Sequence, residues 1–264
     1  MVLASMTFHL NFDYINLLSK KDVVIGLPKL KYVKDQLCSS CEISKEKRSS
    51  FKTMVVASSK GRLNLLYMDL CGPMQVASIN EKKYIMVIVD DLLSIHGTLF
   101  LRSKDETPEV LKDFLTMIQR NLQALVISVR TDRGTEFLNK TLNAFFKQEG
   151  IEHQTSTSRT PEQNGVVERR NRTLVKAARS MLSASKLPLF FWAEAIATAC
   201  YTQNRSIIIP TYEKMTYHII NDKKPSIKHL HIFGCTCYLP RDGENLDKMK
   251  VKGDSCILVG YFTQ

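Results

Sequence analysis

The sequence predicts an α/β protein in which a five-stranded mixed sheet is flanked by helices. Strand-like and helix-like segments alternate along the middle of the chain, which is the order expected of such a fold. Segment 84–90 is an unbroken apolar run, typical of a buried strand. The length of 264 residues allows one medium domain with one or two small units beside it.

Turn residues and hydrophobic spacing give the expected elements. Thr107 and Pro108 open a helix, Gly150 ends another, and Pro188 ends the longest one. Strands are expected over 62–70, 84–90, 96–102, 125–131 and 151–155. Helices are expected over 107–121, 139–149, 163–186 and 190–204. Two further strand-like segments, 232–239 and 256–262, indicate a small β unit near the end of the chain.

The charge of the chain narrows the choice of partners. Lys and Arg outnumber Asp and Glu by 37 to 26, which gives a net charge of +11 and a pI near 9.3. Such a surface favours a polyanion, most often nucleic acid, although a basic soluble protein is the simple alternative. Seven scattered cysteines favour a reducing compartment. We expect no membrane partner and no signal peptide, because no apolar run reaches the length of a membrane helix.

Three carboxylates stand where strands and helices begin or end. Asp69 lies at the end of the first expected strand, Asp132 just past the fourth, and Glu168 in the first turns of the long helix. Singly, each would be a turn, cap or dipole-complementing residue. Brought together, they could hold two Mg²⁺ or Mn²⁺ ions for phosphoryl transfer, since these cations prefer carboxylate oxygens. Without a cation their charges would raise one another's pKa.

The residues around these carboxylates resemble those of copia-type retrotransposon integrases. The resemblance rests on the order Asp69, Asp132, Glu168 and on the 35 residues between the last two. It extends to the motifs Thr160-Pro-Glu-Gln-Asn-Gly165, Phe191-Trp-Ala-Glu-Ala195 and Phe233-Gly-Cys235, and so covers nearly all of the chain.

The resemblance implies a ribonuclease-H-like core in which these three carboxylates are the catalytic, metal-binding triad. It implies Mg²⁺-dependent processing of DNA 3′ ends, with water as nucleophile, and then their transfer to target DNA. The implied partners are the element's DNA ends, the target DNA and further copies of the chain. The implied location is nuclear during action on DNA and otherwise cytoplasmic.

Three regions follow from the resemblance. Residues 1–55 would be a remnant of the zinc module that precedes the integrase core, 56–222 the core, and 223–264 a truncated SH3-like β segment. The chain is then either a piece of a Pol polyprotein or a degenerate genomic copy.

Basic and amide side chains near Glu168 form the candidate DNA-binding surface. Arg172 and Arg179 follow Glu168 at helical spacing and would share its direction. The alternative is an ordinary solvated face. The full candidate set is Gln163, Asn164, Arg169, Arg170, Arg172, Lys176 and Arg179.

A zinc site is the last candidate. His9, Cys38 and Cys41 resemble part of the family's His-His-Cys-Cys module, but Ala4 stands near the place of the first histidine. Three ligands make a poor structural Zn²⁺ site, which normally has four. Two free thiols and a surface histidine are the alternative interpretation, and His96 and His153 are other candidate ligands.

Two other functions remain open at this point. The missing histidine and the short C-terminal segment fit a nucleic-acid-binding relic without catalysis. A ribonuclease-H-type nuclease acting on RNA–DNA hybrids is a further alternative, which the context of Glu168 disfavours.

Overall fold

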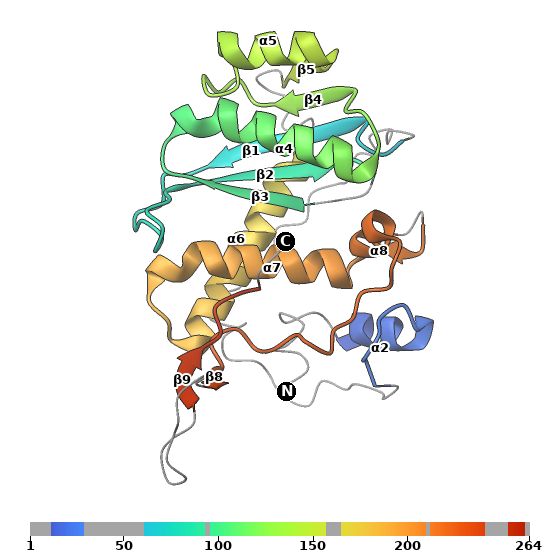
Figure 1. Cartoon of the computed structure of the whole chain (residues 1–264), viewed down its shortest axis with the longest axis vertical. Coiled ribbons are helices and arrows are strands. Elements are labelled where there is room, and N and C mark those ends of the chain that lie inside the picture. The colour runs from blue at the N-terminus through green and yellow to red at the C-terminus, as the bar shows by residue number, and fades with distance from the viewer. Residues whose placement is uncertain are drawn as a thin grey trace.

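The computed structural model describes residues 12–28, 61–92, 96–156, 165–209, 212–240 and 253–261. Its centre is a five-stranded sheet in the order β3-β2-β1-β4-β5 (Figure 1). Strands β1, β2 and β3 pair antiparallel, whereas β1, β4 and β5 pair parallel, so the predicted mixed sheet is confirmed. The bounds are β1 Leu65–Cys71, β2 Tyr84–Asp90, β3 His96–Leu101, β4 Ser128–Thr131 and β5 Glu152–Thr155.

Helices cover both faces of this sheet (Figure 1). Alternate residues of β2 point to opposite faces of the sheet. Met86 and Ile88 pack in one apolar cluster with residues of α4 and α5. Ile85, Val87 and Val89 pack in the other cluster with residues of α6 and α7. A strand buried on both faces needs the continuous apolar run that its sequence has. The helices are α4 Thr107–Leu122, α5 Lys140–Glu149, α6 Gly165–Ser185 and α7 Trp192–Ser206.

Local signals explain where helices begin and end. The side chain of Asn139 caps α5 by accepting a 2.7 Å hydrogen bond from the backbone N–H of Leu142. Gly150 ends the same helix with φ +68°, a conformation that glycine adopts without a Cβ penalty. The predicted apolar stripe of the long helix is confirmed, because Val167, Leu174 and Met181 are all buried.

Several predicted bounds were wrong. β1 begins at Leu65 rather than 62, because Leu63 adopts a left-handed φ of +58° that a strand cannot continue through. β4 is limited to Ser128–Thr131 and lacks the first three expected residues. The segment expected as a helix over 190–204 begins as a 3₁₀ turn, η2, at Leu189–Phe191, and α7 then runs to Ser206.

A second layer of short elements was not predicted. Helix α2, Phe12–Lys21, packs with the strands β6, Ile208–Ile209, and β7, Lys214–Met215, and helix α8, Thr216–Asn221, follows them. The Tyr14 hydroxyl accepts a 2.6 Å hydrogen bond from the backbone N–H of Ile208. Residues 12–28 therefore lie against the end of the predicted core, and the three-region division stays a prediction.

The C-terminal β unit is an antiparallel pair, β8 Thr236–Pro240 with β9 Gly253–Ile257. Cys237 and Cys256 lie opposite each other in that pair and are free thiols, as are the other cysteines in the described ranges. Within those ranges no helix is both long and apolar enough to cross a membrane.

Phe137→Ala is expected to lower the free energy of unfolding by about 3–5 kcal/mol, because Phe137 is fully buried beneath β4 and α5. The matched control is Leu138→Ala, which removes a neighbouring side chain that is 47% exposed and should change stability by about 0.5 kcal/mol or less. Urea denaturation measures both, and equal losses would contradict this packing.

Candidate active site

Asp69 lies on β1, on the face of the sheet that α6 covers. Residues 67 and 69 point to the same side of the strand, and Tyr67 belongs to the cluster beneath α6 and α7. In the parallel pairing of β1 with β4, Tyr67 is opposite Arg130. Asp132 directly follows Thr131, the last residue of β4, so it comes just past the strand that neighbours β1.

Asp132 begins a tight turn directly after β4. Its Oδ1 accepts a 3.1 Å hydrogen bond from the backbone N–H of Gly134, which fixes the carboxylate relative to the turn. The side chain remains partly exposed, as is that of Asp69. One oxygen is therefore anchored by the backbone while the group stays accessible.

Helix α6 contributes Glu168 and a residue that sequence reasoning missed. Glu168 is exposed on the first turn, and Asn171 is buried three residues later. The Nδ2 of Asn171 donates a hydrogen bond to Oδ2 of Asp69. The sequence did hold a signal, because Asn171 is a polar residue on the otherwise apolar buried stripe of α6.

The charges around Asp69 act together. Burial raises the pKa of Asp69 above its ordinary value, the Asn171 hydrogen bond opposes that rise, and the charges of Asp132, Glu168 and Glu136 add to it. The pKa of Asp69 thus responds to the charges of the other two predicted carboxylates, and also to that of Glu136.

The donor set suits a hard divalent cation. The acidic residues and Asn171 offer carboxylate and amide oxygens, which are the ligands that Mg²⁺ and Mn²⁺ prefer. In the described part of the chain no three His, Cys, Asp or Glu side chains already converge on one point as metal ligands. Asn171 also has a buried Oδ1 without a hydrogen-bond partner, so the site holds oxygen-ligand capacity beyond its carboxylates.

The basic residues of α6 lie mainly on its exposed side. Arg169, Arg172 and Arg179 are exposed like Glu168, whereas Arg170 and Lys176 are partly buried. Burial, with a smaller contribution from the charge of Arg169, lowers the pKa of Arg170. Gln163, Asn164 and the zinc candidates His9, Cys38 and Cys41 lie outside the described residues.

The alternative zinc ligands fall in different settings. His153 is on β5, where its Nε2 lies 2.9 Å from the hydroxyl of Thr131, and burial lowers its pKa. His96 is the first residue of β3, which is the edge strand opposite to β5 in the sheet. His153 belongs to no metal-ligand cluster among the described residues, and the His96 side chain lies outside them.

A groove of about 440 Å³ lies elsewhere, along the second half of α6 and the start of α7. Arg179 and Lys186 border an apolar floor that includes Leu182 and Trp192. None of the three predicted carboxylates lines this groove, so its size does not bear on the acidic site.

Comparison with known proteins fits this geometry. Residues 60–161 match the model of the integrase core domain. The chain is 34% identical, over 96% of its length, to the retrovirus-related Pol polyprotein from transposon TNT 1-94 of Nicotiana tabacum. It is 28% identical, over 85% of its length, to that from transposon RE2 of Arabidopsis thaliana. The chain spans only 19% and 15% of these two relatives.

A solved structure shares the fold. A chain of the simian T-cell lymphotropic virus intasome in complex with PP2A regulatory subunit B56 gamma superimposes with a TM-score of 0.52. The match covers 81% of this chain and 69% of that chain at 16% sequence identity.

The mixed sheet and its flanking helices, with the match to the integrase core domain, define an integrase core of the ribonuclease-H-like α/β class. Within that class, the chain belongs to the integrase regions of retrotransposon Pol polyproteins, of the copia type.

Asp69→Asn is expected to raise the thermal midpoint of the protein at neutral pH in the presence of a chelator. The folded-state pKa of Asp69 lies above its ordinary value of 3.8, so stability falls as pH rises from that value through the folded pKa. Removing the charge restores this lost stability, and each kcal/mol of unfolding free energy regained raises the thermal midpoint by about 2–4 °C.

The control for that experiment is Asp113→Asn, which removes the same charge from an exposed position on α4. Calorimetry should show a rise for Asp69→Asn alone. A lower midpoint for Asp69→Asn than for the wild type would contradict the repulsive site.

Proposed function

We propose that the protein catalyses Mg²⁺-dependent processing of DNA 3′ ends and their transfer into target DNA. The observation that carries the proposal is the position of Asp69 on β1, of Asp132 directly after the neighbouring β4 and of Glu168 on the first turn of α6, with Asn171 of α6 hydrogen-bonded to Asp69. Membership of the integrase family supports the choice of reaction. The water and the DNA 3′-hydroxyl are the successive nucleophiles in this proposal.

The chain's own residues have separate tasks in this reaction. Asp69 and Asp132 would hold the cations from the sheet, and Glu168 would complete the set from α6. Asn171 orients Asp69 through the hydrogen bond from its amide. When bound, a pair of divalent ions neutralises charge on the attacking and leaving oxygens.

The exposed arginines of α6 would bind the DNA backbone. They share the helix and the exposed side of Glu168, so phosphates held by them would lie close to the acidic residues. The net charge of +11 favours the same partner. We also propose that the chain acts as a multimer, in the nucleus, and as part of a longer Pol polyprotein before its release.

Asp132→Asn is expected to reduce strand transfer in Mg²⁺ or Mn²⁺ by about 100-fold or more, because the loss of a cation ligand removes several kcal/mol of transition-state stabilisation. Duplex oligonucleotides that carry the element's end sequence would serve as substrate, and joined products would be quantified on gels.

Glu152→Gln is the control, because it neutralises an exposed carboxylate on β5 outside the acidic site. It should retain activity. If wild type and Asp132→Asn were equally silent yet bound DNA, the chain would be a DNA-binding relic instead, and preferential cleavage of RNA–DNA hybrids would indicate a ribonuclease-H-type nuclease.

Arg172→Ala should weaken duplex binding and reduce the slope of log affinity against log salt by about 1, because each phosphate contact releases condensed counterions. Fluorescence anisotropy between low and moderate salt measures this slope. Lys214→Ala, at an exposed position on β7, removes the same charge and should leave the slope unchanged. Equal slopes for all three proteins would place the DNA elsewhere.

A further inference from the structure

Lys104 and Glu136 form an ion pair that links two segments distant in sequence. The Nζ of Lys104 lies 3.2 Å from Oε1 of Glu136. The Glu136 side chain is only 5% exposed, whereas that of Lys104 is 48% exposed. Burial of a carboxylate is costly unless a cation compensates it, and Lys104 supplies that cation.

Glu136 extends this pair toward the acidic site. It lies four residues after Asp132, in the turn that Asp132 begins. Gly134 allows the Glu136 carboxyl to lie close to the backbone of this turn, because a Cβ at position 134 would be only 2.7 Å from the carboxyl carbon of Glu136. The turn that anchors Asp132 therefore also carries the carboxylate of Glu136 against its backbone.

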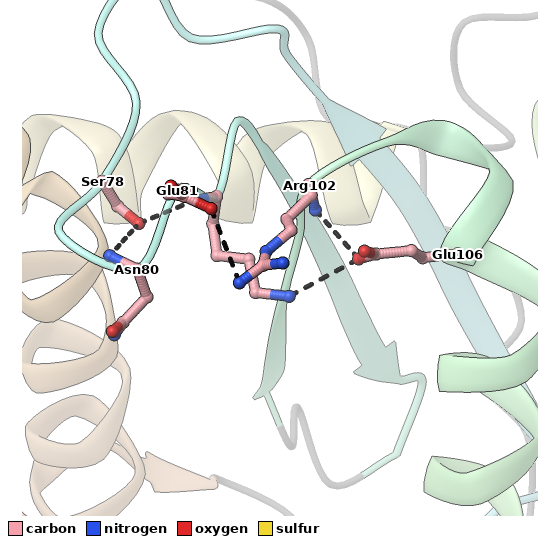
Figure 2. Close-up of polar contacts among 6 residues, drawn as sticks. Ser78, Asn80, Glu81, Arg102 and Glu106 are labelled. Carbon is pink, nitrogen blue, oxygen red and sulfur yellow. Dashed lines mark hydrogen bonds and ion pairs between the residues drawn. The ribbon is translucent and has the colours of Figure 1, made fainter.

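Lys104 is held from the opposite side. It begins the 3₁₀ turn η1, Lys104–Glu106, between β3 and α4. Glu106 accepts a 2.9 Å hydrogen bond from the backbone N–H of Arg102, and the Arg102 guanidinium lies 3.6 Å from a carboxylate oxygen of Glu81 (Figure 2). Each contact is weak alone because it is exposed, but together they tie η1 to the loop between β1 and β2.

The same loop contributes a second contact to Glu106. The Nζ of Lys82 lies 3.5 Å from Oε2 of Glu106, and the Ser78 hydroxyl accepts hydrogen bonds from the backbone N–H groups of Asn80 and Lys82. Figure 2 shows these residues in a row, from Ser78 through Glu81 and Arg102 to Glu106. Segment η1 is therefore fixed at Glu106 and presents Lys104 to Glu136.

We propose that Lys104 and Glu136 are a charge-setting pair for the cation site. Glu136 places a fourth negative charge against the turn that anchors Asp132, where it acts through space on a bound cation, and Lys104 offsets that charge. Both are positioning residues, because neither is a proposed cation ligand or a proposed DNA contact. The inference rests on the proposed function, since it concerns the affinity of that site for divalent ions.

Opposite effects of the two single variants distinguish this role from simple bracing. Glu136→Gln leaves the Lys104 charge uncompensated and should weaken Mn²⁺ binding by about three- to tenfold. Lys104→Met leaves Glu136 uncompensated and should tighten Mn²⁺ binding by a similar factor, about three- to tenfold. The double variant should return close to the wild-type affinity.

Mn²⁺ titration of the free protein, followed by calorimetry and by the thermal midpoint, measures these affinities without DNA or turnover. Lys112→Met changes the net charge equally on α4, and should leave Mn²⁺ affinity unchanged. Asp132→Asn should abolish the response, which shows that the titration reports the acidic site.

Weaker binding in both single variants, without recovery in the double variant, would mean that the pair only braces the turn and would overturn the inference. Should Lys104→Met fail to fold, recovery of affinity from Glu136→Gln to the double variant still decides. A wild type with no response to Mn²⁺ would remove the proposed cation site itself, and with it this inference.

Discussion

The parallel pairing of β1 with β4 is the constraint on which the rest of the site depends. It makes β4 the direct neighbour of β1, so that Asp132, the first residue after β4, follows the strand next to the one that carries Asp69. The apolar residues that fill both faces of the sheet fix the register of this pairing, because a shift by one residue would exchange the side chains that pack in the two apolar clusters. The packing of the core therefore also determines where the carboxylates lie.

The consequence is a concentration of negative charge around Asp69. Asn171 relieves part of the repulsion by donating its amide to Asp69, and Lys104 compensates the deeply buried Glu136. Both compensating groups come from elements outside the paired strands, α6 and η1. Proteins commonly give up some stability at their functional sites in this way.

Much of the core could be predicted from the sequence. The run Tyr84–Asp90 matched β2 residue for residue, and the Thr107-Pro108 start placed α4 correctly. These elements carry strong local signals, namely continuous apolar character and a helix-opening proline. The order of the three acidic residues also had a local basis, since each stands at the end of an element.

What sequence could not supply were contacts across the fold. The left-handed turn at Leu63, the packing of α2 beside β6 and β7, and the hydrogen bond from Asn171 to Asp69 depend on segments more than a hundred residues apart or on local backbone geometry without a distinctive motif. Glu136 lies only four residues after Asp132 in the sequence. Its importance became evident only from its burial and its pairing with Lys104.

The central claim is that Asp69, Asp132 and Glu168 together bind divalent cations. The most direct measurement is a crystal structure of the protein with Mn²⁺, with the ions located by anomalous scattering. We expect two anomalous peaks about 3.5–4 Å apart, bounded by these three carboxylates. Peaks confined to other parts of the surface, with the carboxylates left apart at saturating Mn²⁺, would contradict it.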